Sequence, residues 1–140
     1  MNGLSIEGLG DVDMGELKEA GFGELNLSLV SAAEDFQKEL GRPFKTSMFE
    51  KIVHSAKKEG MKVRSYFILG LPGQTREEIG QTIDYLKKLD VEIYPSVYYN
   101  VFAPMTQWKT QRSSAFFNET DFLSRDDLIF FFNQAHAGQR

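Results

Sequence analysis

The chain has 140 residues, 41% of them hydrophobic and 26% charged, which is typical of one globular domain and argues against long disorder. Its net charge of −4 and its lack of a Lys/Arg cluster argue against a nucleic-acid binder. The absence of cysteine excludes disulfides, thiolate metal sites and a cysteine nucleophile in this chain.

Membrane and export signals are also missing from the sequence. No apolar run approaches the ~20 residues of a membrane span, and no basic segment leads into an apolar one at the N-terminus. We therefore expect a cytoplasmic protein with no membrane partner.

Capping patterns predict the first helices. In each, a short polar side chain can accept a hydrogen bond from a free backbone NH group, and an acidic residue follows three positions later. The helix from Thr75 is the clearest, because apolar residues recur behind it at helical spacing. The predicted pairs of cap and acid are Asp13 with Glu16, Ser31 with Glu34, Ser47 with Glu50, and Thr75 with Glu78.

Three strand patterns lie between these helices, at Glu24 to Leu29, Lys62 to Leu69 and Glu92 to Phe102. Helices that alternate with strands predict right-handed crossovers and a parallel sheet. Every second residue of the first strand is leucine, whereas Asn26 and Ser28 between them are polar. We expect helices to cover the apolar face, and the polar face to line an interior or crevice.

Arg64 on the second strand also falls on the polar face. It could line a cavity or bond to Asn26.

The segment after Phe102 is weakly patterned up to Thr120 and is predicted to be a loop. A further helix is predicted from Ser124, with Asp126 and Asp127 in its first turn. Five apolar residues follow at 128–132, more than one amphipathic face holds, which indicates burial on several sides or contact with other protein. The predicted layout is an irregular start over 1–11, βα units over 12–104, and a loop with a C-terminal helix over 105–140.

The stretch FILGLPGQT, residues 67–75, joins the second strand to the Thr75 helix. Gly70 and Gly73 permit positive φ or a close approach, and Pro72 stiffens the turn. Backbone NH groups at the helix start could meet an anion, but no Gly-Lys-Ser or Gly-Lys-Thr follows, so the stretch is not a P-loop. These residues alone favour a plain βα turn and leave ligand contact as the alternative.

Five segments in a fixed order shift the interpretation of this stretch from a plain turn toward ligand contact. The chain from Gly15 to Gln107 resembles the later part of the radical S-adenosylmethionine (SAM) enzymes. The resemblance implies a partial, TIM-like (β/α) barrel whose parallel strands line a SAM site at their C-terminal ends. The matching segments are LKEAGF at 17–22, LNLSLVSA at 25–32, ELGR at 39–42, FILGLPGQT at 67–75 and VFAPMT at 101–106.

The resemblance also implies site residues. Ile68 and Gly70 match positions on the adenine side of SAM, with ordinary core packing as the alternative for Ile68. Ser31 matches a serine that approaches the ribose, although it is also the predicted helix cap. Arg42 matches an arginine near the SAM carboxylate, which a guanidinium suits, with a solvated position before Pro43 as the alternative.

Three positions depart from the family pattern. Val30 replaces a usual Gln or Glu, Gln74 replaces the Glu of GLPGET, and VFAPMT lacks the usual Pro-Gly. The departures bear on the ribose contact and the last loop rather than on the fold.

The family's chemistry depends on a [4Fe-4S] cluster held by a CxxxCxxC motif, which delivers an electron to SAM. This sequence cannot ligate the cluster in that manner, because it has no cysteine. We interpret the chain as a C-terminal fragment of a larger iron–sulfur, oxidoreductase-type enzyme, inactive alone, with the N-terminal half of the barrel as its partner.

A cut barrel exposes strand edges, so we also expect self-association. The alternative is a non-catalytic α/β interaction module.

Other candidate residues have simpler interpretations. His54 and His136 lack partners at metal-ligand spacing and are predicted to be surface residues. Glu77 and Glu78 fall in a first helical turn, where the helix dipole explains them. Packing explains the aromatic residues Tyr94, Tyr98, Tyr99, Phe102 and Trp108, with a substrate-facing role left open for Tyr98 or Tyr99.

Overall fold

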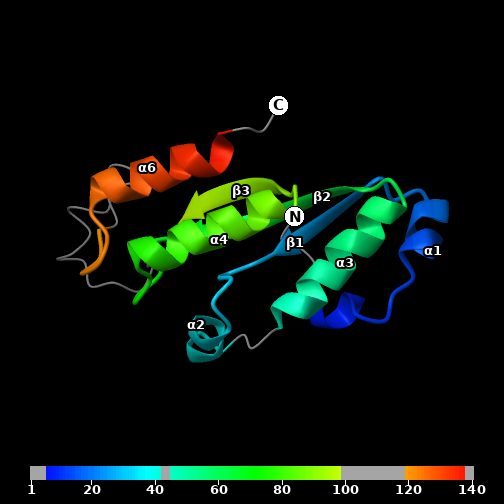
Figure 1. Cartoon of the computed structure of the whole chain (residues 1–140), viewed down its shortest axis with the longest axis horizontal. Coiled ribbons are helices and arrows are strands. Elements are labelled where there is room, and N and C mark those ends of the chain that lie inside the picture. The colour runs from blue at the N-terminus through cyan, green and yellow to red at the C-terminus, as the bar shows by residue number, and fades with distance from the viewer. Residues whose placement is uncertain (1–5, 42–44, 99–118, 138–140) are drawn as a thin grey trace, which may run out of the picture.

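A computed structural model describes residues 6–41, 45–98 and 119–137 of the chain (Figure 1). Helices separate the three strands, as predicted, and two of them, α2 and α3, lie between β1 and β2. The elements are η1 (Ile6–Leu9), α1 (Met14–Glu19), β1 (Glu24–Ser28), α2 (Glu34–Glu39), α3 (Thr46–Lys58), β2 (Lys62–Leu69), α4 (Arg76–Lys88), β3 (Glu92–Val97) and α6 (Arg125–His136).

The described strands form one parallel sheet in the order β1-β2-β3, which confirms the predicted parallel pairing. Leu25 pairs with Val63, and Phe67 pairs with Pro95. Proline has no backbone NH to donate to a neighbouring strand. Pro95 is tolerated because β3 is an edge strand of the described sheet, with no described strand on its outer side. β3 ends at Val97, whereas the prediction ran to Phe102, a residue outside the described ranges.

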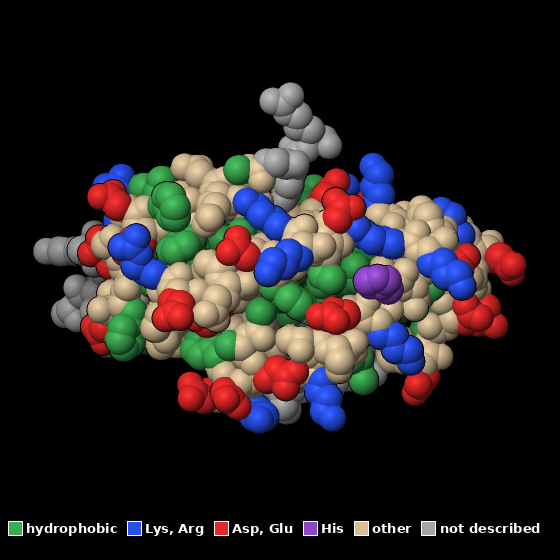
Figure 2. All heavy atoms as spheres, in the orientation of Figure 1, with side chains coloured by type: hydrophobic (Ala, Val, Ile, Leu, Met, Phe, Trp, Pro, Cys, Tyr) green, Lys and Arg blue, Asp and Glu red, His purple; other side chains and the backbone are tan. Residues whose placement is uncertain are grey.

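Helices cover one face of the sheet. Figure 1 shows α3 and α4 lying across the strands, and α6 packs on β3 and α4. The side chains between the layers form one apolar cluster, in which Leu27, Phe67 and Ile83 are fully buried. On the outside of this layer, Figure 2 shows acidic and basic side chains interspersed over the visible face.

The opposite face of the sheet is polar and partly open among the described residues. On β1 and β2 its side chains are half-buried or exposed and their neighbours along the strand are buried, whereas on β3 only Ile93 is buried. This alternation confirms the predicted polar face. We call it the open face; it carries Glu24, Asn26 and Ser28 of β1, Arg64, Tyr66 and Ile68 of β2, and Glu92, Tyr94 and Ser96 of β3.

Arg64 occupies the middle of the open face and bonds to acids on both neighbouring strands. Its Nε donates to Glu92 Oε2 at 2.8 Å, and its Nη1 forms an ion pair with Glu24. Asn26 donates to the same Glu24 carboxylate at 3.0 Å. The ion pairs raise the pKa of Arg64 above its ordinary value, against a smaller opposing effect of burial.

Three of the predicted caps are observed. Asp13 Oδ1 accepts from the Gly15 NH at 2.7 Å, and Thr75 Oγ1 accepts from the Glu78 NH at 3.3 Å. Ser124 begins α6 with a full capping box, since its hydroxyl and the Asp127 carboxylate each accept from the other's backbone NH. These bonds satisfy donors that a helix start otherwise leaves free.

The other two caps were predicted wrongly. Helix α2 has Ala33 as its N-cap, and Ser31 lies two residues earlier, where its Oγ accepts from the Ala33 NH at 2.9 Å. Helix α3 has Lys45 as its N-cap, so Ser47 lies inside the helix. Glu34 explains the difference, because its carboxylate accepts from the NH and hydroxyl of Thr46 and joins the two helix starts.

Candidate functional site

The candidate site lies where the parallel strands end. The segments that follow β1 and β2 leave the sheet at the same edge, and Tyr98 follows β3 there. The ladder extends slightly past the strands, since the Leu29 NH donates to Tyr66 and the Tyr98 NH donates to Leu69 O at 2.7 Å. Ligands of parallel α/β proteins bind at this edge, because the connecting loops converge on it.

Gln74 holds the loop after β2 from the inside. Its side chain is fully buried, and its Oε1 accepts from the NH groups of Gly70 at 2.7 Å and Leu71 at 3.2 Å. Its Nε2 donates to Ile68 O at 3.1 Å. The family pattern has glutamate at this position. An amide can accept and donate hydrogen bonds at once, so glutamine can hold the loop from here.

Ile68 lies at the C-terminal end of the open face, and Gly70 follows directly after β2. Ile68 is half-buried opposite Ser96, whereas the flanking Phe67 and Leu69 point into the buried core. Gly70 is buried and has a φ of 83°, which a residue with a Cβ adopts only with strain. An apolar side chain and a backbone without a Cβ therefore lie side by side at the strand end.

Ser31 lies on the helix side of this edge. Its side chain is fully buried, as is most of the neighbouring Val30, and its hydroxyl oxygen accepts from the Ala33 NH. The next residue, Ala32, donates its NH to Thr82 Oγ1 on α4. Arg42, the segment VFAPMT, Tyr99 and Trp108 lie outside the described residues.

Glu78 was assigned only a dipole effect, because it falls in a first helical turn. Its carboxyl is largely withdrawn from solvent, and burial raises its pKa above the ordinary value, while Ser31, Thr82 and Gln74 oppose the rise. Thr82 is fully buried; its Oγ1 accepts from the Ala32 NH at 3.0 Å and lies 3.3 Å from Glu78 Oε1. The signal in the sequence was the spacing of four between Glu78 and Thr82, which puts both on one helix face.

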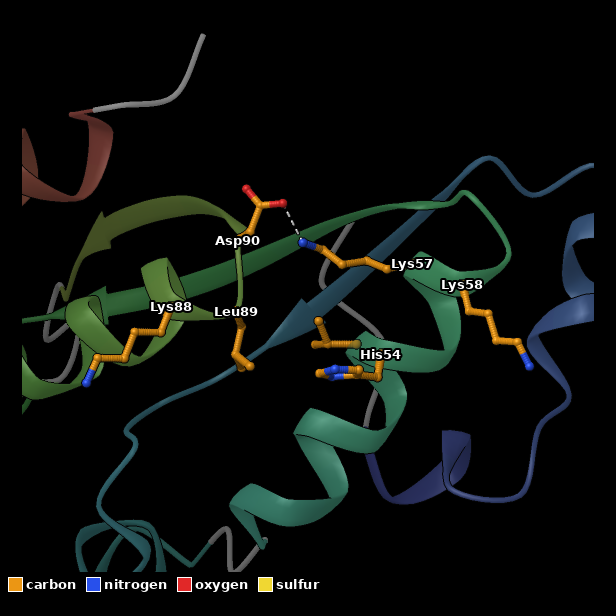
Figure 3. A pocket seen from close by; sticks show the side chains of 7 residues that line it. His54, Lys57, Lys58, Lys88, Leu89 and Asp90 are labelled. Atoms are coloured by element: carbon orange, nitrogen blue, oxygen red, sulfur yellow. Dashed lines mark hydrogen bonds and ion pairs between the residues drawn. The ribbon is translucent and has the colours of Figure 1, made fainter.

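A groove lies between the C-terminal ends of α3 and α4, near the starts of β2 and β3 (Figure 3). Lys57 crosses it to bond to Asp90 at 2.6 Å, while Lys58 and Lys88 point away. His54 on its rim is exposed, as is His136 on α6, which confirms the surface positions predicted for both. The remaining lining residues are Val53 and Leu89.

Metal and membrane features were sought over residues 6–41, 45–98 and 119–137. Within these ranges no group of three or more His, Cys, Asp or Glu residues is placed to hold a metal ion. No helix there is long and apolar enough to cross a membrane. Because the whole sequence lacks cysteine, the residues present do not fit a [4Fe-4S] cluster bound in the family's manner.

Comparison with known proteins defines the class. The model of the radical SAM superfamily matches residues 1–86, and the chain belongs to this superfamily. Over 76 residues, 54% of the chain, it is 33% identical to "Uncharacterized methyltransferase PH0819" of Pyrococcus horikoshii, covering 17% of that protein.

The fold agrees with this assignment. The chain matches the structure of coproporphyrinogen III oxidase (HemN) from Escherichia coli, a radical SAM enzyme, with a TM-score of 0.66 and 18% identity. The match covers 94% of the chain and 31% of HemN. The chain thus has an α/β fold similar to part of a TIM-like barrel, and it spans less than a third of each of these relatives.

Proposed function

We propose that this chain is part of a radical SAM iron–sulfur enzyme of oxidoreductase type and contributes one wall of its SAM site. The observation that carries the proposal is the pair Ile68 and Gly70 at the C-terminal edge of the open face, in a loop fixed by Gln74. Membership of the superfamily supports it.

The residues of this wall suit the adenosine part of SAM. Ile68 offers a half-exposed apolar side chain for the face of the adenine ring, and Gly70 lets the ring come close because it has no Cβ. Ser31 and Arg42 are proposed for the ribose and the carboxylate, Ser31 acting from a buried position. When bound beside a reduced cluster, SAM supplies the hydrogen-abstracting chemistry of the family.

The cluster ligands would come from outside this sequence. We propose that the N-terminal half of the barrel supplies them, and that the chain alone neither binds iron nor cleaves SAM. The lack of cysteine and the much greater length of the relatives support this view.

The test compares the chain with the same sequence joined to an upstream barrel half that carries CxxxCxxC. We expect the joined enzyme to bind SAM and to form 5′-deoxyadenosine under reducing conditions, and the 140-residue chain to form none. In the joined enzyme, Ile68→Ala should weaken SAM binding about tenfold through lost apolar contact. Ile129→Ala on α6, also half-buried, is the matched control. Formation of 5′-deoxyadenosine by the chain alone would overturn the proposal.

Two other functions predict different results in this experiment. The name of the Pyrococcus relative favours methyl transfer, which would leave S-adenosylhomocysteine instead of 5′-deoxyadenosine as the main product. A non-catalytic interaction module would bind no SAM even when joined to the upstream half.

A further inference from the structure

We propose that the middle of the open face binds a planar, uncharged ring whose edge donates a hydrogen bond, with the side chains of Tyr66 and Tyr94 as its stacking surface. The inference rests on the proposed function for its place in a reaction, because it makes this ring part of the substrate that lies beside SAM. It names a chemical class of ligand and no particular compound.

The strand register sets the position of the two rings. It places Tyr66 level with Ser28 and Tyr94, and these three residues form the middle layer of the open face. Arg64 lies one layer toward the strand starts, and Ile68 lies one layer toward the candidate site. Successive layers are about 7 Å apart, because a strand rises by about 3.3 Å per residue. A ligand on the middle layer therefore lies next to the proposed adenine-side wall.

The middle layer offers an aromatic surface. The ring centres of Tyr66 and Tyr94 are 5.7 Å apart, and the ring planes are tilted by 47°. Tyr94 is 37% exposed and Tyr66 is half-buried, so described residues leave part of this surface uncovered. Flat rings stack on such a surface or meet it edge-on. A planar ligand therefore suits it better than a puckered aliphatic one.

The charges of the open face favour an uncharged ligand. Arg64 is already bonded to Glu24 and Glu92, and its guanidinium carbon lies 5.3 Å from the centre of the Tyr94 ring. In the described sheet, neither the middle layer nor the layer of Ile68 holds a charged side chain. An anion would find no unpaired cation in these layers, and a cation would compete with Arg64 for the Tyr94 ring.

A buried acceptor beside the rings lacks a donor. The Asn26 amide nitrogen donates to Glu24 Oε1 at 3.0 Å, whereas Asn26 Oδ1 is buried without a hydrogen-bond partner among the described residues. An unpaired buried acceptor costs free energy, so this position favours a ligand that brings a donor. Asn26 is level with Arg64 and is thus the diagonal neighbour of Tyr66. A ring stacked on Tyr66 can direct an NH group at its edge toward this oxygen.

The polarity of the open face also argues against simple filling by barrel side chains. The interior of a TIM-like barrel is usually packed with branched apolar residues, whereas this face carries Asn26, Ser28 and two tyrosines. Upstream strands would pair with the sheet edges at β1 and β3, so their backbones would not cover the open face. The middle layer is therefore left for a ligand.

The experiment measures the binding of three probes to the 140-residue chain by saturation-transfer NMR, at a dilution where light scattering shows a monomer. Benzamide is planar, uncharged and carries an NH₂ donor. Benzoate has the same shape with a negative charge, and cyclohexanecarboxamide carries the same amide on a puckered ring. We expect benzamide to bind with a roughly millimolar Kd, at least about fivefold more tightly than either of the other probes.

Substitutions locate the bound probe. Tyr66→Leu and Tyr94→Leu should each weaken benzamide binding about fivefold, and Asn26→Ala about threefold because the ring loses its acceptor. The matched control is Phe130→Leu, which removes an aromatic ring on α6 that is 55% exposed and should leave benzamide binding unchanged. Circular dichroism checks each fold. If Tyr66→Leu does not fold, Tyr94→Leu decides, because Tyr94 is exposed.

Four results would overturn the inference. Equal binding of benzoate would contradict the uncharged class, and equal binding of cyclohexanecarboxamide would contradict stacking. Loss of benzamide binding in Ile68→Ala, with both tyrosine variants unaffected, would place the probe at the proposed adenine-side wall instead. If the chain stays associated at every dilution and excludes benzamide, a second copy covers the open face and the inference is wrong.

The proposed function is tested separately, through 5′-deoxyadenosine formation by the joined enzyme. If the joined enzyme forms none while the chain prefers benzamide, the proposed function fails and the ligand class stands without its place beside SAM. If the joined enzyme cleaves SAM and the chain shows no preference for benzamide, the inference alone is wrong.

Discussion

The guanidinium carbon of Arg64 lies 5.3 Å from the centre of the Tyr94 ring on the neighbouring strand. Tyr94 in turn contacts Tyr66, with 5.7 Å between ring centres. Together with Glu24 and Glu92, these side chains tie all three described strands across the open face. The open face is therefore a built polar lining, in which the central cation is held by carboxylates and by an aromatic ring.

Replacing Arg64 tests this lining. In Arg64→Met, Glu24 and Glu92 lose the cation between them and remain as like charges on the same face of the sheet, so the urea midpoint should fall. Adding Glu92→Gln should recover part of the loss, because it removes one of the two charges. An unchanged midpoint in Arg64→Met would show that the network contributes nothing to stability.

Replacing Gln74 tests the loop after β2. Gln74→Leu leaves the NH groups of Gly70 and Leu71 and the carbonyl of Ile68 unpaired, which should cost about 2–4 kcal/mol of unfolding free energy. Gln74→Glu keeps the acceptor bonds and loses the donor, so we expect a loss of about 1 kcal/mol. Gln81→Leu on the exposed side of α4 is the control and should change little. Denaturant unfolding followed by circular dichroism measures all three.

Glu78 should make stability depend on pH. Burial raises its folded pKa above the ordinary 4.5, so between these two values the folded chain binds more protons than the unfolded one. Its contribution to stability is therefore complete below the unfolded pKa and is lost as the pH rises through the folded pKa. Glu78→Gln removes this loss, and its melting temperature should gain on the wild type as the pH rises through this window. If the melting temperatures of the wild type and Glu78→Gln change in parallel with pH, the raised pKa of Glu78 is contradicted.

The caps of α6 and α3 allow a paired test. Ser124→Ala removes the capping box and should cost about 1 kcal/mol, whereas Ser47→Ala should be neutral or stabilising, because Ser47 lies inside α3 and alanine favours helix. Hydrogen bonds from Ser124 also lower the pKa of Asp127 in the folded chain. The contribution of Asp127 to stability is therefore present above pH 3.8, the ordinary pKa, and is lost as the pH falls through the lowered pKa. A loss at Ser47 equal to that at Ser124 would contradict the assigned helix start.

The sheet edges lead to a prediction about association. β1 and β3 are both edges of the described sheet, and its open face carries the half-buried Tyr66 and the exposed Tyr94. We expect the chain alone to self-associate with rising concentration, and light scattering measures this. Addition of the upstream barrel half should reverse it. A monomer at all concentrations would argue that the edges are protected.

The order of the elements was predictable because it depends on local signals. The apolar spacing behind Thr75 and the alternation of Leu25, Asn26 and Leu27 fix a helix and a two-faced strand from neighbouring residues alone. The helix starts at Ser31 and Ser47 were mispredicted because the deciding contact joins Glu34 to Thr46, across twelve positions of sequence. A capping pattern cannot show such a contact.

The candidate site was predictable in part, for the same physical reason. The places of Ile68 in a strand and of Gly70 in the turn after it follow from local signals, whereas their assignment to SAM came from the family resemblance. The hydrogen bond from the Ala32 NH to Thr82 spans fifty positions, and Thr82 in turn contacts Glu78. Such contacts arise only when α4 packs beside the end of β1, so they required the tertiary structure.

The three bonds of Gln74 all close within residues 68–74. The loop therefore carries its own shape and needs no contribution from the upstream half of a barrel to acquire it. A chimera that joins this chain to the upstream half of a different radical SAM enzyme should keep the loop, and with it the proposed adenine-side wall, intact. Its success or failure would then depend on how well the strand edges meet, rather than on this loop.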